Sequence, residues 1–160
     1  MIFLTVGTLF PFDRLVRTVD EAAHRVGLDE ELFGQIGPST YVPRHMRYVD
    51  RLPKAEFDEL IEGASGLIGH AGIGTITMAL QHNKPLLVLP RLHRYGEHVN
   101  DHQLGTARKF ESLGHVMAAY SEDELIAKLH RLADFVPTPR TPQPEAVAGR
   151  IRRFIGPLTP

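Results

Sequence analysis

One stretch constrains the fold of this chain more than any other: residues 67–80, where an apolar run is followed by a turn with glycine at positions 69, 72 and 74 and then by a second apolar run. This order predicts a short strand, a tight turn and the start of a helix. Glycine lets a ligand approach the backbone closely, and the first amides of a helix lack partners within it and lie at the positive end of its dipole. The turn is therefore typical of a diphosphate site, although tight packing alone also selects such glycines.

Apolar runs and helical patterns alternate along the rest of the chain. Runs at 2–6, 32–36, 46–49, 67–68, 86–89 and 116–119 predict about six strands. Apolar residues at helical spacing predict helices over 15–26, 53–64, 73–82, 99–113 and 121–132, with Gly27, Asn83 and Gly114 at the ends of three of them. Strands that alternate with helices in this way predict an α/β fold, a doubly wound Rossmann-like parallel sheet.

The pattern changes near residue 135. Residues 1–135 form one expected domain, and prolines at 137, 139, 142 and 144 predict a stiff linker over 136–144. Residues 145–160 are expected to form a short helix and a tail. Arg150, Arg152 and Arg153 on that helix are interpreted as a solvated face, with contact to a partner or to an anionic membrane surface as the alternative.

Composition excludes several classes of function. A formal net charge of −1 gives no concentrated basic face, so we expect no nucleic acid partner. No apolar run is long enough to cross a membrane, and residues 1–6 are interpreted as a first strand rather than a signal peptide. The absence of cysteine excludes disulfides and thiolate metal sites, and it is compatible with the cytoplasm.

Four loops are expected at the carboxyl edge of the sheet, where ligands of such folds bind: residues 7–9, 35–37, 70–75 and 90–103. The last loop carries Arg, His, Glu, Asn, Asp and Gln within thirteen positions, which suits a site that binds sugar hydroxyls, or else a solvated surface loop. On a helix, His98 and His102 would share one face and could bind a metal, but no third ligand is evident, so no metal site is predicted. His70 is either a hydrogen-bonded loop residue or a catalytic base.

With these residues in view, the chain resembles a known family. The motifs His-Ala-Gly-Ile-Gly-Thr at 70–75, Lys-Pro-Leu-Leu-Val-Leu-Pro-Arg at 84–91 and Gly-Glu-His-Val-Asn-Asp-His-Gln at 96–103 are similar to the C-terminal domain of family 28 glycosyltransferases, which is half of a GT-B fold. The start, Leu-Thr-Val-Gly-Thr at 4–8 with Pro-Phe-Asp at 11–13, is similar to the stand-alone donor-binding subunits of two-part transferases that assemble dolichol-linked glycans or bacterial exopolysaccharides.

The resemblance implies a UDP-sugar site. Gly7 and Thr8 would face the phosphates, and the backbone near Arg51 and Leu52 would hold the uracil. The diphosphate would lie on Ala71, Gly72, Gly74 and Thr75, while Glu97, Asn100, Asp101 and Gln103 would contact the sugar or the phosphates. The same loops add Gln35, His70 and Arg91 to the expected donor-binding set. One position departs from the family: where many members carry a ribose-binding Glu, this chain has Met78, whose thioether cannot accept those hydrogen bonds.

The resemblance also implies a partner, because the chain supplies one of the two domains of a GT-B enzyme. We expect a membrane-anchored subunit that binds a lipid-linked saccharide acceptor, and so a cytoplasmic chain held at the inner face of the membrane. Alone, the chain is a candidate homodimer. Transfer is expected to need no metal or other cofactor, because helix-start amides and side chains stabilise the leaving UDP. The general base is expected on the partner, with His70 as the candidate within this chain.

Two other classes stay open. A non-catalytic regulatory or partner-binding subunit would keep the fold and tolerate the change at Met78. An epimerase of the same fold would need a second domain, which the length of 160 residues disfavours. A nicotinamide-dependent Rossmann enzyme is also disfavoured, because the first turn, Gly-Thr-Leu-Phe-Pro at 7–11, lacks the dinucleotide fingerprint.

Overall fold

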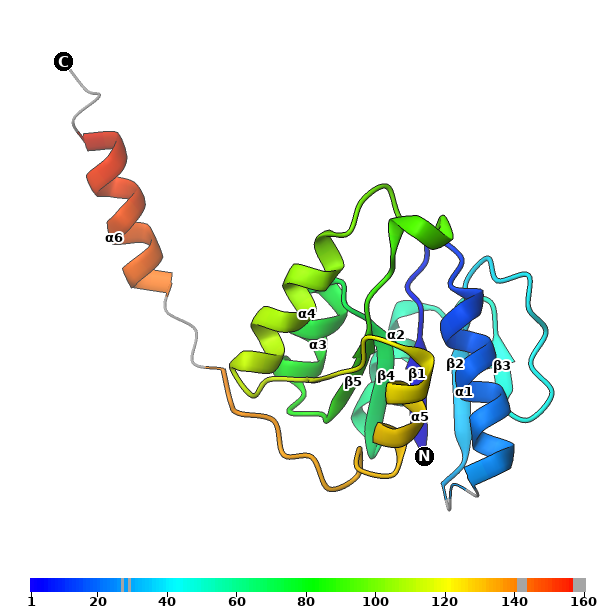
Figure 1. Cartoon of the computed structure of the whole chain (residues 1–160). Helices are drawn as coiled ribbons and strands as arrows, with labels where there is room; N and C mark the ends of the chain where they lie inside the picture. The colour runs from blue at the N-terminus through cyan, green and yellow to red at the C-terminus, as the bar shows by residue number, and fades with distance from the viewer. Residues whose placement is uncertain (27, 29, 141–143, 157–160) are drawn as a thin grey trace.

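The computed structural model describes residues 1–26, 28, 30–140 and 144–156, and it forms an α/β domain with a separate terminal helix (Figure 1). The strands are β1 (Ile2–Thr5), β2 (Leu32–Gln35), β3 (Arg47–Val49), β4 (Gly66–His70), β5 (Leu86–Leu89) and β6 (Met117–Ala118). The helices are α1 (Asp13–Val26), α2 (Lys54–Gly63), α3 (Ile73–Gln81), the short 3-10 helix η1 (His93–Tyr95), α4 (His102–Ser112), α5 (Glu122–Leu129) and α6 (Pro144–Ile155).

The six strands form one parallel sheet in the order β3-β2-β1-β4-β5-β6. This arrangement confirms the predicted doubly wound Rossmann-like fold. The strand order reverses direction between β1 and β4, where Thr5 pairs with Gly69. Because all strands run the same way, the loops that follow them meet at one edge, and the crevice between β1 and β4 is the switch point at which such sheets bind ligands.

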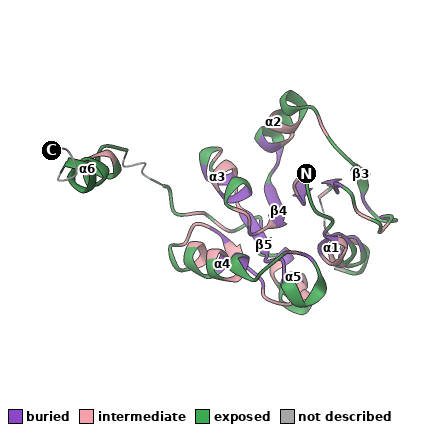
Figure 2. Cartoon of the chain, turned by 90° about the horizontal axis from the view of Figure 1, so that it is seen from above, coloured by how far each residue is buried: buried purple, intermediate pink, exposed green. Residues whose placement is uncertain are grey.

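Successive residues of β1 point to opposite faces of the sheet and enter different cores. Leu4 belongs to a cluster with apolar residues of α1 and α5, whereas Phe3 packs in a second cluster with residues of α2, α3 and α4. Figure 2, which looks down on the molecule, shows α1 and α5 on one side of the buried strands and α2 and α3 on the other. Burial on both faces explains why the central strands β1, β4 and β5 are largely apolar.

Most predicted elements lie close to their expected positions, but one helix begins later. α4 starts at His102 rather than at Val99, because the preceding segment forms η1 and then turns back at Gly96, whose φ is +68°. Asn83 adopts a φ of 50° after α3 and Gly114 a φ of 69° after α4, as expected for helix ends. The end predicted at Gly27 lies outside the described residues.

The domain keeps contacts with the chain slightly beyond residue 135. The Thr138 amide donates to the Gly114 carbonyl oxygen over 2.8 Å, and a ring nitrogen of His115 lies 2.7 Å from the Thr138 carbonyl oxygen. Farther along, α6 stands apart from the sheet and its helices (Figure 1), and none of its residues is buried. The parts of the predicted linker and tail at 141–143 and 157–160 lie outside the described residues. Within the described ranges, no helix is long and apolar enough to cross a membrane.

The segment between β2 and β3 is held by one buried carboxylate. Asp20 of α1 accepts hydrogen bonds from the amides of Arg44, His45 and Met46 and from the Tyr41 hydroxyl, over 2.8 to 3.0 Å. Burial by itself would raise the pKa of Asp20, but these donors favour the ionised form and hold the pKa below its usual value.

Asp20→Asn is therefore expected to destabilise the domain by about 2 kcal/mol at neutral pH, because the buried donors lose a charged acceptor. Since the pKa of Asp20 is lower in the folded state, its contribution is complete above about pH 4 and is lost as the pH falls through the folded-state pKa. The difference in urea stability between wild type and variant should thus shrink at low pH. The exposed Asp134→Asn change should alter stability little at either pH. A difference that stays constant down to pH 2 would contradict this role.

Candidate functional site

A cleft of about 600 Å³ opens at the switch point, between α2 and α3. It brings together six residues predicted for the site: Gly7, Thr8, Gln35, Leu52, Gly74 and Thr75. Met78 also lines it. The sequence reasoning missed the other lining residues, which are Thr5, Lys54, Phe57, Asp58, Glu62, Gln81 and His82. Of these, positions 54, 58 and 62 recur at every fourth residue of α2, a signal for one shared helix face.

The start of α3 is open to this cleft. Gly72 is the N-cap residue, and no side chain caps the helix. A Cβ placed on Gly74 would meet no atom within 4 Å, so this position has free space beside it. The first amides of a helix have no partners within it. An uncapped helix start of this kind, with glycine on the side of the cleft, is suited to an anion.

Gly72 and Gly7 are needed for a different reason: a side chain at either position would come too close to the ring of His70. A Cβ on Gly72 would lie 2.1 Å from the Cε1 atom of His70, and one on Gly7, whose φ is +77°, would lie 3.1 Å from its Nε2 atom. Ala71 is buried in the core cluster of Phe3. Of the four residues expected at the diphosphate, Gly74 and Thr75 therefore line the cleft, while Gly72 and Ala71 shape the turn.

Both ring nitrogens of His70 lie close to polar side chains. Its Nε2 atom lies 3.1 Å from the Thr75 hydroxyl, and its Nδ1 atom lies 3.5 Å from the side-chain nitrogen of Gln103. The Gln103 side-chain oxygen accepts from the Arg91 amide, so its NH₂ group faces His70 and Nδ1 is the accepting nitrogen. Burial lowers the pKa of His70 to about 4, and the nearby charges of Arg91 and His98 act in the same direction. His70 is therefore neutral at pH 7.

We expect the NMR signals of the His70 ring to stay unchanged from pH 8 to pH 5.5, because in the folded protein this ring takes up no proton over that range. Comparison with His70→Asn assigns these signals. The unfolded chain protonates this histidine below about pH 6.5. The stability that neutral His70 contributes is thus present above that pH and is lost between about pH 6.5 and 4. His70→Asn should lose less stability than wild type over this interval. Titration of the His70 signals near pH 6.5 would contradict the prediction.

Gln35 and Arg51 position the wall of the cleft opposite α3. The side-chain oxygen of Gln35, which is buried, accepts from the Leu52 amide over 3.1 Å. The Arg51 guanidinium donates to the Thr8 carbonyl oxygen over 3.3 Å. These bonds link the segment after β3 to the loop after β1, so the structure places the backbone at 51–52 beside Gly7 and Thr8.

Arg91 and Glu97 form a buried network rather than part of the cleft lining. Arg91 donates to the carbonyl oxygens of Val6, Phe10 and Pro11 over 2.7 to 2.9 Å. Burial lowers the pKa of Arg91 to about 10, against the opposing effect of the Glu97 carboxylate, so it stays charged at neutral pH. Both Glu97 oxygens accept from Arg14 over 2.7 and 2.8 Å, and one also accepts from the Leu92 amide. This network ties the loop after β1 to the loop after β5.

The other polar residues of the loop after β5 also bind to neighbouring groups of the protein. The Asn100 side chain accepts from the His102 amide over 3.1 Å, and Asp101 accepts from the His93 amide over 2.7 Å. Gln103 is buried against His70 and Arg91. These residues follow β5 at the same edge of the sheet as the cleft, but none of them lines it.

His98 and His102 were the one metal candidate, but α4 begins at His102, so His98 lies in the preceding loop and the two do not share a helix face. Their rings meet edge to face with centroids 4.5 Å apart. Within the described ranges, no group of three or more His, Asp or Glu residues is placed to hold a metal ion.

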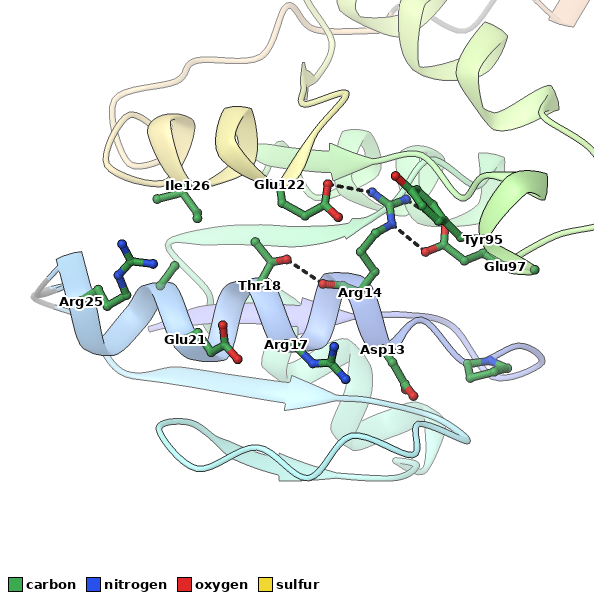
Figure 3. Close-up of a pocket in the computed structure, with 13 residues that line it drawn as sticks. Asp13, Arg14, Arg17, Thr18, Glu21, Arg25, Tyr95, Glu97, Glu122 and Ile126 are labelled. Atoms are coloured by element: carbon green, nitrogen blue, oxygen red, sulfur yellow. Dashed lines mark hydrogen bonds and ion pairs between the residues drawn. The ribbon is translucent and has the colours of Figure 1, made fainter.

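A second cavity of about 560 Å³ lies on the opposite face of the sheet, between α1 and α5 (Figure 3). Arg14, Arg17, Glu21 and Arg25 of α1 line it, together with Glu122 of α5. Arg14 reaches across it to Glu122 over 3.6 Å, in addition to its bonds with Glu97. The sequence reasoning did not single out this face, because charged residues at helical spacing are the usual pattern of a solvated helix.

Comparison with known proteins shows where this architecture occurs. Residues 1–153 match the model of the glycosyltransferase family 28 C-terminal domain. A curated relative, the UDP-N-acetylglucosamine transferase subunit ALG13 of Eremothecium gossypii, is 38% identical over 79 residues, which are 48% of this chain and 37% of that protein. The chain therefore spans little more than a third of the relative's length.

Solved structures share the fold at low sequence identity. The solution structure of ALG13 matches with a TM-score of 0.60 and 21% identity, over 94% of this chain and 93% of that one. The glycosyltransferase of kitacinnamycin matches with a TM-score of 0.62 and 21% identity, over 95% of this chain and 37% of its own. MurG of Acinetobacter baumannii matches with a TM-score of 0.55 and 17% identity, over 84% of this chain and 42% of its own.

Proposed function

The chain belongs to the glycosyltransferase family 28 C-terminal domain family, and on that premise we propose that it is the donor-binding subunit of a two-component glycosyltransferase. The complete enzyme would transfer a sugar from a UDP-sugar to a lipid-linked acceptor. This chain would bind the nucleotide and stabilise the leaving UDP, and a second chain would hold the acceptor. The name of the curated relative, which describes a transferase subunit, supports a divided enzyme.

The observation that carries the proposal is the open, uncapped start of α3 beside the cleft. A diphosphate placed there would receive the free amides and the dipole of the helix. The attached nucleoside would then extend between α2 and α3, along Leu52, Phe57 and Met78. The negative charge that develops on the leaving group would be stabilised by fixed backbone donors, so we expect catalysis without a metal.

Met78 lines the part of the cleft in which the ribose would lie. A thioether is only a weak hydrogen-bond acceptor. Asp58, Glu62 and Gln81 line the same cleft and carry the oxygens needed to accept bonds from ribose hydroxyls. Ribose binding in this proposal therefore uses one of these side chains.

Three exposed apolar residues at the rim of the site support a contact surface for a partner. Leu9, Ile73 and Val99 lie in the loops at the carboxyl edge and at the start of α3, and each side chain is at least 60% exposed. Large apolar side chains exposed around a binding site are typical of an interaction surface. We propose that the acceptor-binding partner covers this rim, supplies the general base and holds the chain at the inner face of the membrane. His70 is a poor base because both of its ring nitrogens contact other side chains.

A non-catalytic regulatory subunit is the second candidate, and Met78 is the observation that favours it. Such a protein would bind the partner without binding a nucleotide. The two functions therefore differ in the affinity of the assembled complex for UDP.

Calorimetric titration of the chain with UDP and several UDP-sugars, with and without EDTA, tests the proposal. Binding in the micromolar to millimolar range that EDTA leaves unchanged is expected, and the sugar nucleotide that binds more tightly than UDP would identify the donor. If the isolated chain does not bind, the same titration is repeated on the complex with its partner. Absence of binding in both experiments would overturn the donor-binding function and favour the regulatory one.

A further inference from the structure

The two helices that wall the cleft present their lining residues at matching heights. The lining residues that recur at every fourth position are Lys54, Asp58 and Glu62 on α2, and Gly74, Met78 and His82 on α3 and its C-cap. Four residues make about one helical turn, with a rise of about 6 Å. Both helices connect parallel strands, so they run in the same direction past the cleft. The two sets therefore follow the cleft together, one turn at a time.

A contact between Glu62 and His82 sets how the two helices are aligned. The Oε1 atom of Glu62 lies 3.9 Å from the Nδ1 atom of His82. Glu62 belongs to the last turn of α2, and His82 is the C-cap residue of α3. Because the helices run the same way, the lining residues one turn earlier also face each other, and these are Asp58 and Met78.

The diphosphate proposed at the start of α3 determines the height of the ribose. Gly74 marks the diphosphate end of the cleft, and Lys54 stands opposite it at the start of α2. The ribose is joined to the first phosphate through its 5′ oxygen, so it lies about one helical turn farther along the cleft. That is the height of Asp58 and Met78.

Asp58 is the strong acceptor at this height. The Met78 thioether is only a weak hydrogen-bond acceptor, whereas a carboxylate accepts through two oxygens. The Oδ2 atom of Asp58 accepts from the Lys54 ammonium group, and its Oδ1 atom has no hydrogen-bond partner in the part of the chain that the structure describes. Both side chains reach solvent, at 39% exposure for Asp58 and 86% for Lys54. An exposed ion pair of this kind contributes little to stability, so a ligand can replace it.

We propose that Asp58 binds the 2′ and 3′ hydroxyls of the ribose and makes the cleft selective for ribonucleoside diphosphate sugars over their deoxyribose counterparts. This inference rests on the proposed donor-binding function and names the residue that binds the ribose. Both hydroxyls donate to the carboxylate, and the Lys54 ammonium group turns from Asp58 to the diphosphate at its own height. Glu62 lies one turn too far from the diphosphate, beside His82.

Calorimetric titration with UDP and with its 2′-deoxy and 3′-deoxy analogues tests the proposal. We expect UDP to bind about tenfold more tightly than either analogue, because each analogue lacks one hydrogen bond to a charged acceptor. In Asp58→Ala the affinity for UDP should fall at least about tenfold, and the three nucleotides should bind equally. Alanine favours the helix, so circular dichroism should show an unchanged fold.

Three further variants isolate the role of this carboxylate. Glu59→Ala removes the same charge from the neighbouring exposed position of α2, outside the cleft, and should match wild type in affinity and in preference for UDP. Lys54→Ala breaks the ion pair but keeps the carboxylate, so it should weaken the binding of all three nucleotides alike and leave the preference intact. Glu62→Ala should also retain the preference.

The outcomes separate this inference from the function on which it rests. Equal binding of UDP and its analogues by wild type would overturn the ribose role of Asp58, as would a preference that persists in Asp58→Ala or disappears in Glu62→Ala. In each of these cases UDP still binds, and the donor-binding function stands. Absence of UDP binding, both to the isolated chain and to its complex with the partner, would overturn the function and this inference together.

Discussion

Replacement of Gly74 by aspartate is expected to abolish UDP binding and to leave the fold intact. The new side chain has free space beside it, since a Cβ at this position meets no atom within 4 Å. A carboxylate in the first turn of α3 suits the helix dipole, so thermal stability should be unchanged or slightly higher. The same carboxylate would occupy the anion site and repel a diphosphate. We expect the affinity for UDP, measured by calorimetry, to fall more than a hundredfold, or about 3 kcal/mol.

Two other variants separate the causes of this effect. Gly74→Asn adds nearly the same volume without the charge and should weaken binding less than aspartate. Gly105→Asp places the same charge in the first turns of α4, where a Cβ also meets no atom within 4 Å, and should leave UDP affinity near the wild-type value. Retention of full affinity by Gly74→Asp would exclude the start of α3 as the diphosphate site.

Arg91→Met is expected to have the largest effect on stability. Arg91 is only 2% exposed, and it donates to three carbonyl oxygens of the loop after β1. Methionine keeps much of the apolar volume but leaves these oxygens without a charged donor. We expect the free energy of unfolding to fall by about 3 kcal/mol and the melting temperature by about 6–12 °C. Thermal unfolding followed by circular dichroism measures both quantities.

The neighbouring exposed Arg94 provides the control. Its guanidinium lies over the ring of Tyr95, 4.7 Å from the ring centroid, and Arg94→Met should change stability by less than about 0.5 kcal/mol. Unchanged melting of Arg91→Met together with a loss of UDP affinity would contradict the structural role. That result would assign Arg91 to direct contact with the ligand.

The fold was predictable because each of its signals is local. The strand β5 is an uninterrupted apolar run between two prolines, and Asn83 occupies a left-handed position that few residue types accept. The sequence Ser-Glu-Asp-Glu at 121–124 has the pattern of a capping box, and the Ser121 side chain accepts from the Glu124 amide as that pattern requires. The Glu124 carboxylate, however, accepts from the Tyr120 amide rather than from that of Ser121. Which amide the Glu124 carboxylate reaches depends on the backbone conformation around the cap, and residue types alone do not specify that conformation.

The candidate site was predictable only in part. Gly74 and Thr75 follow a strand directly, so their position at the edge of the sheet follows from the sequence. The sugar-binding role of the polar loop after β5 stays a prediction: Glu97 and Asp101 accept hydrogen bonds from Arg14 and from the His93 amide, and neither residue lines the cleft. Arg14 is 83 residues away from Glu97 along the chain, and no local pattern identifies such a partner.

The sequence by itself determined the succession of strands and helices, the parallel sheet and the glycine turn before α3, because short-range steric and hydrophobic patterns fix these features. Only the tertiary structure decided which polar side chains face the cleft and which bond to other parts of the protein. It brought α2 beside α3, so that Lys54, Asp58 and Glu62 line the cleft, and it buried Arg91 and Glu97. The physical reason is that a buried charge must find partners wherever packing places them, and those partners come from segments distant in the sequence.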